Sequence, residues 1–336
     1  MVGIHHRENS FSTKWIEYCE LNNIQYKIID CYKNNIIEEV KDCDYILWHW
    51  HHTLTRDALF AKQLIHSFEL MGKKVFPNSD TSWHYDDKVG QKYLFESVNA
   101  PFINTYVFYN KKEAIEWVNN TNFPKIFKLR GGAGANNVSM CKEKDDAIKK
   151  INKAFLNGFN SRNKFYTLEK NLWQFKRDKN LKSFINIFKG MIRIFIPSES
   201  DKNSTIEKNY VYFQDFIPDN NCDYRIVIIG EKAFGFKRMV RDGDFRASGS
   251  GKTIYDHKEI PVECLKLAFD TTKKIKSQSA AYDFVFLNGT PVIIEVSFAF
   301  AFGYKNCSGY WDDNLNWVEK NFFPEYFMIE NLINDK

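Results

Sequence analysis

Two acidic residues interrupt an otherwise apolar stretch between residues 280 and 298. Asp283 lies in a first segment and Glu295 in a second, and both are surrounded by Phe, Val and Ile. Acidic side chains are rare in such surroundings unless a partner compensates their charge. Asn288-Gly289, between the two segments, favours positive φ, so the stretch is predicted to form a β-hairpin that carries one carboxylate on each strand.

The length of the hairpin turn decides whether these two acids share a face. A two-residue turn would place Asp283 opposite Ile294 and direct Glu295 to the other side of the sheet. A three-residue turn that includes Thr290 would pair Asp283 with Glu295, and this is the arrangement we expect. Two opposed carboxylates repel each other unless a cation lies between them, and oxygen ligands suit Mg²⁺. The alternative, two edge carboxylates on a solvated hairpin, agrees poorly with the apolar neighbours.

The composition is that of a folded protein large enough for two or three domains. The chain has 336 residues, 44% of them hydrophobic, and a net charge of +5. It has no apolar run of about 18 residues and no signal-peptide pattern at its start, so we expect a cytoplasmic protein. The seven cysteines are widely spaced and never form a C-x-x-C pair. They are expected to be buried thiols and not disulfides or zinc ligands.

Strand and helix patterns alternate over residues 1–77, which predicts a small parallel sheet with helices on its faces. A group of polar residues follows the first predicted strand and another follows the third: His5, His6 and Arg7, then His49, His51 and His52. If these strands are neighbours, both groups lie at the carboxyl edge, where parallel sheets bind ligands. We interpret them as a pocket for an acidic substrate, with Arg7 clamping a carboxylate or phosphate. The alternative is that the histidines cap loops or stack within the fold, and their spacing does not suit zinc.

A glycine-rich loop follows a strand near residue 128. Lys128 alternates with Phe127 and Leu129 and should project from the opposite face. The loop that follows contains Gly131, Gly132 and Gly134, and its backbone N–H groups, with the charge of Lys128, could close over phosphates. The alternative is a flexible hairpin tip, which would have the same sequence pattern.

Residues 151–208 have the composition of an insertion. Between 161 and 193 basic residues far outnumber acidic ones and are interleaved with aromatic residues. We expect a solvated helical hairpin with an apolar inner face. Contact with an anionic membrane surface and binding to a nucleic-acid backbone are the alternatives.

The remaining chain is predicted to contain antiparallel strands. Residues 210–217 form a strand, and a hairpin turning at Gly230-Glu231 carries Asp223 and Arg225 at alternate positions, with Lys237 and Arg238 on its second strand. A polar loop with Arg246 follows, and its GSGK sequence lacks the Walker spacing. A helix over 261–276 then precedes the hairpin with the two acids. We expect the aromatic tail, with Tyr310, Trp311 and Trp317, to pack as a final helix.

Taken in order, these features resemble an ATP-grasp enzyme of the carboxylate–amine ligase type. This group includes glutathione synthetase and the enzyme that adds glutamates to a ribosomal protein. The features are Lys88, Lys128 with its glycine loop, the strand YFQDFI, DYRIVIIG, the loop with Arg246, and Asp283 with Glu295. The fold class expected is α/β and α+β. A parallel α/β domain (1–77) precedes two α+β subdomains (78–150 and 209–336) that clasp ATP, and the insertion (151–208) separates them. The first 140 residues are also similar to ATP-grasp proteins of bacterial surface-polysaccharide clusters.

The resemblance implies a role for each matching residue. Lys88 and Lys128 would reach ATP phosphates, and Gly131, Gly132 and Gly134 would cover them. The adenine would contact the backbone of a hinge strand, with Asp215 or Asp219 near the ribose; the strand residues are Gln214, Asp215, Phe216 and Ile217. Arg225 and Arg246 would hold the transferred phosphoryl group and the substrate carboxylate. Asp283 and Glu295 would bind Mg²⁺, and Ser297 stands where the family usually has Asn, which puts a second metal position in doubt.

The expected reaction is amide formation through an acyl phosphate, with ATP and Mg²⁺ as cofactors. The partners expected are an acid and an amine donor. The acid would be a small molecule or a sugar acid on a lipid carrier, which the basic insertion could meet at the inner face of the membrane. No nucleic-acid partner is expected. The alternatives are a kinase that phosphorylates a small molecule or sugar, and a nucleotide-binding module without catalysis.

Overall fold

The computed structural model describes residues 1–52, 54–131, 137–161, 166–195, 205–241, 245–247 and 249–334. The chain forms two compact units. The first comprises residues 1–51, 56–103 and 217–336, and the second comprises residues 52–55 and 104–216. Gly132 and Gly134 of the glycine loop lie outside the described residues. The domain boundaries given above remain predictions.

The first unit begins with the parallel sheet expected from the alternating pattern. Its strands pair in the order β2-β1-β3-β4. They are β1 (Val2–His5), β2 (Tyr26–Ile29), β3 (Tyr45–Leu47) and β4 (Lys74–Phe76), connected through α1 (Ser12–Leu21), α2 (Ile36–Glu39) and α3 (Thr55–Leu70). Because β1 pairs with both β2 and β3, the two histidine groups do follow neighbouring strands.

A larger antiparallel sheet forms the rest of this unit. Its order is β15-β14-β11-β12-β16-β17, with β13 paired to β12. The strands are β11 (Cys222–Ile229), β12 (Lys232–Met239), β13 (Thr253–Ile254), β14 (Ser279–Leu287), β15 (Thr290–Ser297), β16 (Gly309–Asp312) and β17 (Trp317–Glu319). The helices are α4 (Ser79–Ser82), α5 (Lys88–Ser97), α11 (Val262–Lys274) and α12 (Pro324–Asn334), with 3₁₀ turns at His257–Glu259 and Phe302–Asn306.

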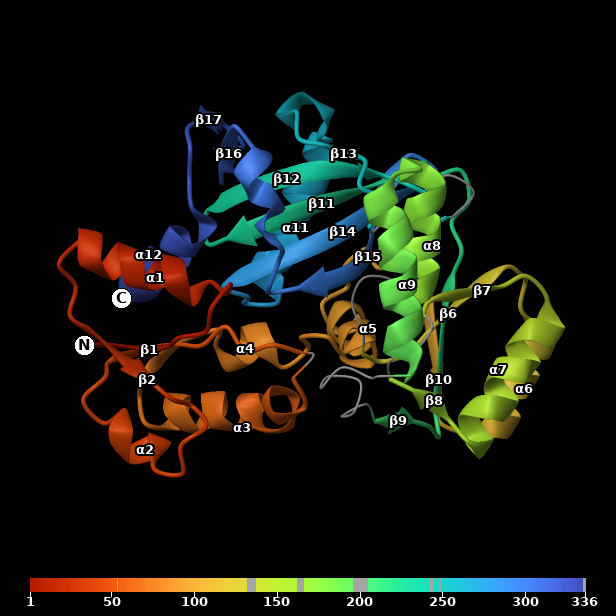
Figure 1. The fold of residues 1–336 in the computed structure, drawn as a ribbon, viewed down its shortest axis with the longest axis horizontal. Coiled ribbons are helices and arrows are strands. Elements are labelled where there is room, and N and C mark those ends of the chain that lie inside the picture. The colour runs from red at the N-terminus through yellow and green to blue at the C-terminus, as the bar shows by residue number, and fades with distance from the viewer. Residues whose placement is uncertain are drawn as a thin grey trace. The chain divides into compact units, whose positions relative to one another are not determined.

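Two apolar clusters hold the large sheet in place. On one side, Ile226, Tyr282 and Phe284 pack with Cys264 and Ala268 of α11. Elsewhere a cluster that includes Val227 and Ile229 joins residues of β1, α1 and α12, and Figure 1 shows α1 and α12 side by side. Apolar burial therefore fixes the strands from which the charged residues described below project.

The second unit contains a four-stranded antiparallel sheet in the order β5-β10-β6-β7. Its strands are β5 (Thr105–Phe108), β6 (Lys125–Lys128), β7 (Ser139–Cys141) and β10 (Val211–Asp215), and β8 (Phe159–Asn160) pairs with β9 (Ile206–Glu207). Helices α6 (Lys111–Asn120) and α7 (Lys144–Leu156) contact each other, and residues of both join Phe127, Leu129 and Phe213 in one apolar cluster.

The basic segment forms the helical hairpin expected from the sequence. Helices α8 (Tyr166–Asp178) and α9 (Leu181–Phe195) pack against each other and are drawn in green in Figure 1. Among the described residues, no helix is long and apolar enough to cross a membrane.

The expected final helix is wrong for the first part of the tail. Tyr310 and Trp311 lie in β16 and Trp317 lies in β17, and only α12 is helical. The rings of Trp311 and Trp317 pack 4.8 Å apart. Aromatic side chains of this kind are favoured on paired strands, which explains why the segment extends the sheet. All seven cysteines are free thiols; six are buried, as expected, and Cys222 is half-buried.

The hairpin β14–β15 has a two-residue turn, so the three-residue turn expected above is wrong. Leu287 pairs with Thr290, and both turn residues have positive φ, +52° for Asn288 and +79° for Gly289. Asp283 nevertheless pairs with Glu295, because the register shifts between Asp283 and Phe284. The two acids are therefore opposite each other because of a β-bulge, which the length of the turn alone does not predict.

The turn provides a test of this backbone geometry. We expect Gly289→Ala to lower the free energy of unfolding by about 1–2 kcal/mol, because a Cβ is disfavoured at positive φ. A Cβ at Gly289 would meet no atom within 4 Å, so the cost is one of conformation and not of a clash. Urea denaturation measures it. Gly303→Ala is the matched control, since its Cβ would make only ordinary contacts, from 3.6 Å outward. Equal destabilisation by both substitutions would contradict the assignment.

Candidate functional site

One face of the large sheet carries a group of charged side chains from neighbouring strands. Arg225 of β11 pairs directly with Asp283 of β14, which pairs with Glu295 of β15. Asp223 of β11 pairs with Arg238 of β12. With Lys88, at the start of α5, these residues form what we call the charged cluster: Lys88, Asp223, Arg225, Arg238, Asp283 and Glu295. Three of its members are basic and three acidic, so its formal charges balance.

Asp283 is held by two arginines. Arg225 donates from Nε to Oδ1 and from an Nη to Oδ2 of Asp283, both at 2.7 Å. Arg238 approaches Oδ1 of the same carboxylate at 2.8 Å and also binds Asp223 in a bidentate manner, at 2.6 and 2.7 Å. The result is a chain of charge-assisted hydrogen bonds from Asp223 through Arg238 and Asp283 to Arg225.

This arrangement sets the protonation states. Burial disfavours the ionised form of Asp283, but the charges of Arg225 and Arg238 outweigh it and hold the pKa of Asp283 well below its usual range. For Asp223 burial is the larger effect, and it raises the pKa of that carboxyl. Burial also opposes the charge on Arg238, but the two aspartates raise its pKa. Asp283 is therefore a carboxylate at neutral pH.

Glu295 occupies a more open position than Asp283. Its side chain is 33% exposed, and Lys88 Nζ lies 3.3 Å from one of its oxygens. Ser297, two residues further along β15, donates a hydrogen bond to the carbonyl of Ala299 at 2.7 Å and accepts one from its N–H at 3.2 Å. The Ser297 hydroxyl is thus used within the backbone turn that ends the strand.

The oxygen donors of Asp283 and Glu295 fit Mg²⁺ chemically. Both are carboxylates, they lie directly opposite each other, and Glu295 is partly accessible. A metal at Asp283 would share its oxygens with Arg225 and Arg238, and Oδ2, which accepts from Arg225, has a further lone pair. No group of three or more His, Cys, Asp or Glu residues suited to a metal occurs in the described part of the chain. A metal here would therefore draw further ligands from bound phosphate or water.

Asp223 and Arg238 were not assigned to a site from the sequence, although a signal for them exists. The expected turn at Gly230-Glu231 is present, and counting back from it places Asp223 opposite Arg238. Two opposite charges at directly opposed positions on one face indicate an ion pair. Since Asp223 and Arg225 alternate along β11, the pair also lies on the face of Asp283.

In the second unit, Lys128 lies on a different face from the apolar core, as expected. Phe127 and Leu129 belong to that core, whereas Lys128 pairs with Tyr212 and is largely buried. Gln214 is on the same face as Tyr212, and its amide donates to the Tyr212 hydroxyl at 2.8 Å and to Thr105 at 3.1 Å. The structure thus brings Lys128 and Gln214 to one side of this sheet.

Asp215 is on the other side. It accepts from Lys125 at 2.5 Å and from the Asn104 amide at 2.9 Å, and Lys125 lies near the ring of Trp117. Of the two candidates for the ribose contact, Asp219 is exposed in the segment after β10 and has a φ of +63°. Phe216 and Ile217 are half-buried, and the boundary between the compact units falls between them.

The rim histidines make mostly structural contacts. His5 is buried, its Nδ1 accepts from the Cys31 N–H at 3.1 Å, and burial lowers its pKa. His49 stacks on Phe11 and accepts from its N–H at 3.2 Å. His6 shares a hydrogen bond with the Ser12 hydroxyl at 3.0 Å.

The remaining residues proposed to bind substrate or phosphoryl groups are all half-buried. Arg7 is half-buried beside these histidines, and the N–H of His51 donates to Asp57 at 2.7 Å. His52 is also half-buried. Arg246, in the segment between β12 and β13, is half-buried, and its carbonyl accepts from the N–H of Arg241 at 3.1 Å.

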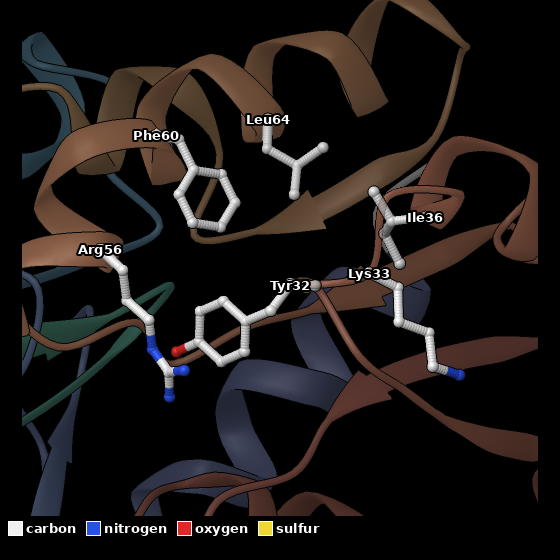
Figure 2. A pocket seen from close by; sticks show the side chains of 7 residues that line it. Tyr32, Lys33, Ile36, Arg56, Phe60 and Leu64 are labelled. Carbon is white, nitrogen blue, oxygen red and sulfur yellow. The ribbon is translucent and has the colours of Figure 1, made fainter.

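A pocket of about 450 Å³ near the parallel sheet was not expected from the sequence. Its lining comes from the end of β2, from α2 and from α3: Cys31, Tyr32, Lys33, Ile36, Arg56, Phe60 and Leu64. The guanidinium of Arg56 lies 3.7 Å from the centre of the Tyr32 ring. Figure 2 shows these two side chains beside each other. Tyr32 also donates to the buried carboxylate of Asp57 at 2.6 Å, which holds the ring in place.

Comparison with known proteins places this architecture. Residues 181–305 match a RimK-like ATP-grasp domain. This part of the chain is therefore similar to that family over a little more than a third of the chain's length. No curated protein sequence matches it, so the likeness to individual proteins comes from solved structures.

Three of the solved structures illustrate this likeness. D-alanine–D-alanine ligase from Bacillus anthracis is 15% identical, with a TM-score of 0.56, over 90% of this chain and 88% of that one. The biotin carboxylase domain of 2-oxoglutarate carboxylase from Hydrogenobacter thermophilus, solved with MgADP and bicarbonate, is 10% identical, with a TM-score of 0.59, over 99% and 69%. A RiPP-associated ATP-grasp ligase from Chryseobacterium gregarium, solved with ADP and a leader and core peptide, is 13% identical, with a TM-score of 0.56, over 99% and 96%.

These matches confirm the fold class and the resemblance to ATP-grasp ligases expected from the sequence. They also agree with ATP and Mg²⁺ as the expected cofactors, since nucleotide and magnesium are bound in the structure of one of the relatives. At this level of identity the likeness shows a shared fold, and the roles of individual residues in this chain remain proposals.

The contacts of Asp283 lead to a prediction about stability. We expect Asp283→Asn to lower the free energy of unfolding by about 3 kcal/mol, because Arg225 and Arg238 would lose an ionised partner in a buried setting. Urea denaturation measures the change. Glu295→Gln is the matched control and should cost about 1 kcal/mol or less, since its ion pair with Lys88 is partly exposed. Similar losses for the two variants would contradict the account.

The same carboxylate should produce a pH dependence. The pKa of Asp283 is lower in the folded protein than in the unfolded chain, so its stabilisation is present above the ordinary carboxyl pKa and is lost as the pH falls. The difference in free energy of unfolding between the parent protein and Asp283→Asn should therefore shrink as the pH falls below about 4. Denaturation curves at several pH values test this. A difference that stays constant down to the lowest pH would argue against an ionised Asp283.

Proposed function

We propose that this protein is an ATP- and Mg²⁺-dependent ligase that joins a carboxylate to an amine through an acyl phosphate. The observation that carries the proposal is the direct pairing of Asp283 with Glu295, with Arg225 at the adjoining position on β11, in a chain with an ATP-grasp fold. Two of its structural neighbours, the D-alanine–D-alanine ligase and the RiPP-associated ligase, are both named as ligases.

The chemistry explains why such a site needs balanced charges. A carboxylate does not react with an amine in water, because its oxygen is a very poor leaving group. Transfer of the γ-phosphoryl group of ATP to the carboxylate gives an acyl phosphate and ADP, and attack by the amine then forms the amide and releases phosphate. The protein contributes position and cancellation of negative charge.

The charged cluster supplies groups for these tasks. Asp283 and Glu295 would hold Mg²⁺, which when bound neutralises charge on the phosphate oxygens. Lys88 and Arg225 lie beside these acids and would contact phosphate oxygens from the protein side. Lys128, Gly131 and Gln214 are the proposed nucleotide contacts of the second unit, together with the remaining residues named for this role in the sequence. Arg246 remains a candidate for the substrate carboxylate.

A metal held by Asp283 would compete with the arginine contacts of that carboxylate. Arg225 is bound to Asp283 through two hydrogen bonds, and its side chain is more exposed than that of Arg238. We infer that Arg225 would exchange a contact with Asp283 for a phosphoryl oxygen if Asp283 held a metal. Arg238 stays with Asp223 and continues to compensate the buried carboxylate. In this way Asp283 avoids an uncompensated charge in either state.

Residues at the rim of the parallel sheet indicate the class of acid. Arg7, beside the rim of the parallel sheet, supports a substrate with a carboxylate, such as an amino acid or a uronic acid. His5, His6 and His49 would shape that rim and not bind the acid through Nδ1, since each Nδ1 atom already forms a hydrogen bond within the protein. A sugar acid on a lipid carrier, modified during surface-polysaccharide synthesis, is the narrower form of the proposal.

One observation favours a second candidate, a nucleotide-binding module with weak or no catalysis. The Ser297 hydroxyl takes part in two hydrogen bonds with Ala299 and would have to break them to bind a second metal. A site limited to one metal would neutralise the phosphate chain less completely.

A substrate screen tests the proposal. The purified protein, ATP and Mg²⁺ are mixed with panels of acids and amines, and ADP release and product mass are measured. We expect ADP release that requires both an acid and Mg²⁺, and a product that has lost one water between the two substrates. Hydroxylamine in place of the amine should trap the acyl phosphate as a hydroxamate.

Two variants make the screen specific to the site. Glu295→Gln should lower kcat by about a hundredfold, because it removes a charged metal ligand. Glu319→Gln is the matched control, since Glu319 is an exposed acid on β17 of the same sheet and should leave turnover unchanged. A product that gains phosphate and stops would instead indicate a kinase. ATP binding without turnover on any panel would indicate the non-catalytic module.

A further inference from the structure

Helix α9 exposes an apolar face. Six of the twenty large hydrophobic side chains that are exposed in the described part of the chain fall within its residues 181–192. They are Leu181, Phe184, Ile185, Phe188, Met191 and Ile192. At 3.6 residues per turn these six positions occupy an arc of about 120°, so they form one continuous face and not scattered exposures.

The apolar inner face expected for this hairpin accounts for only some of the apolar residues of α9. The buried side of α9 is narrow and consists of Ser183, Ile187 and Gly190. A Cβ at Gly190 would come within 3.1 Å of the Leu168 backbone, so the two helices approach closely there. The larger apolar residues point elsewhere, and Phe188 is 50% and Ile192 55% exposed. Hydrophobic burial within the hairpin therefore does not explain them.

Aromatic contacts order this face. The rings of Phe175 in α8 and Phe184 in α9 lie 5.5 Å apart, and those of Phe184 and Phe188 lie 5.1 Å apart. Leu172 of α8 is also exposed and extends the apolar surface onto the second helix. Together the exposed apolar residues of α9, with Leu172 and Phe175, form what we call the outer face of the hairpin.

Positive charge borders the outer face. Lys182 and Lys189 are exposed and lie next to the apolar arc on α9, and Lys176 and Lys179 are exposed where the two helices connect. From residue 166 to 192 the sequence contains six basic and two acidic residues. An amphipathic helix with this distribution of apolar and cationic side chains lies in the plane of an anionic membrane interface.

A lipid surface fits these observations better than a peptide. The outer face runs along the convex side of a helix, whereas a bound peptide is usually held in a groove or along a strand edge. Neighbouring lysines gain free energy from the potential of an anionic leaflet while the aromatic side chains enter its headgroup region. Since no described helix can cross a bilayer, the contact would be peripheral.

We propose that the outer face of the α8–α9 hairpin docks the protein on a bilayer that contains anionic phospholipid. This does not depend on the ligase reaction, and it assigns the hairpin a role of its own. It would place the protein beside substrates that are attached to the membrane.

Vesicle co-sedimentation of the full-length protein tests this proposal. We expect binding to vesicles that mix phosphatidylcholine with phosphatidylglycerol, much weaker binding to phosphatidylcholine alone, and loss of binding as salt is raised. Lys182→Gln with Lys189→Gln should weaken binding to the anionic vesicles by about thirtyfold, at roughly 1 kcal/mol for each lysine. Phe188→Ser with Ile192→Ser should weaken it by about tenfold or more.

A matched pair of substitutions controls for general loss of exposed apolar surface. Leu59→Ser with Leu70→Ser removes two leucines of α3 that are 72% and 77% exposed, and should leave vesicle binding unchanged. All these positions are exposed, so the variants should fold, and thermal unfolding checks that they do. ATP turnover in solution should be the same for all of them, which separates this test from that of the ligase.

Three outcomes would overturn the proposal. The first is no binding of the parent protein to anionic vesicles. The second is that the parent protein binds neutral vesicles as strongly as anionic ones, or that the two hairpin variants bind anionic vesicles as strongly as the parent protein does. The third is a parent protein that sediments as a dimer, does not bind vesicles, and becomes a monomer with Phe188→Ser and Ile192→Ser. That result would assign the outer face to a second copy of the chain.

Discussion

The ionised carboxylate of Asp283 is the constraint on which the charged cluster depends. A buried carboxylate is costly unless positive charge and hydrogen bonds replace its water. Here Arg225 and Arg238, from two neighbouring strands, supply both, and Asp223 in turn satisfies Arg238. The requirement reaches into the strand register, because a slip of one residue on β11 or β14 would turn one partner to the apolar side of the sheet.

Apolar packing on the opposite face of the same strands offsets the free-energy cost of this charge arrangement. Tyr282 and Phe284 flank Asp283 in the sequence and pack with α11, so the residues that hold the strand in place alternate with the residue that carries the charge. Lys88 reaches Glu295 from the first turn of α5, whose Leu94 and Phe95 belong to that same apolar cluster. One face of the sheet thus holds the strands in place, and the other face carries the charged side chains. The charged side chains can therefore change their hydrogen-bond partners without disturbing the packing of the apolar core.

Much of this arrangement could be predicted from the sequence. Strand–helix alternation predicted the parallel sheet, whereas the neighbouring positions of β1 and β3 were assumed and are given by the structure. The pairing of Asp223 with Arg238 was within reach, since the turn at Gly230-Glu231 determines it. The bidentate contact of Arg225 with Asp283 was not, because β11 and β14 are distant in sequence and only the assembled sheet makes them neighbours.

Burial explains the other differences between expectation and structure. His5 and His49 have the types and positions of ligand residues, but their rings pack on Tyr32, Trp48 and Phe11, and no sequence pattern distinguishes a stacked imidazole from an accessible one. Likewise, the helical period of α9 identifies an apolar face, yet it does not show which face α8 covers. The small residues Ser183 and Gly190 were the available signal, since a close helix contact selects small side chains.

The bulge in β15 shows which part of the geometry is essential. Ile294 is the extra residue, and a chain lacking it would form a regular ladder in which the glutamate still stands across from Asp283. Opposition of the two acids therefore does not require an added residue. What the added residue contributes is local bend and twist, which tilt the glutamate relative to its neighbour. A bulge can therefore change the angle between the two carboxylates, and with it the size of the ion they could bind, while the two residues stay paired.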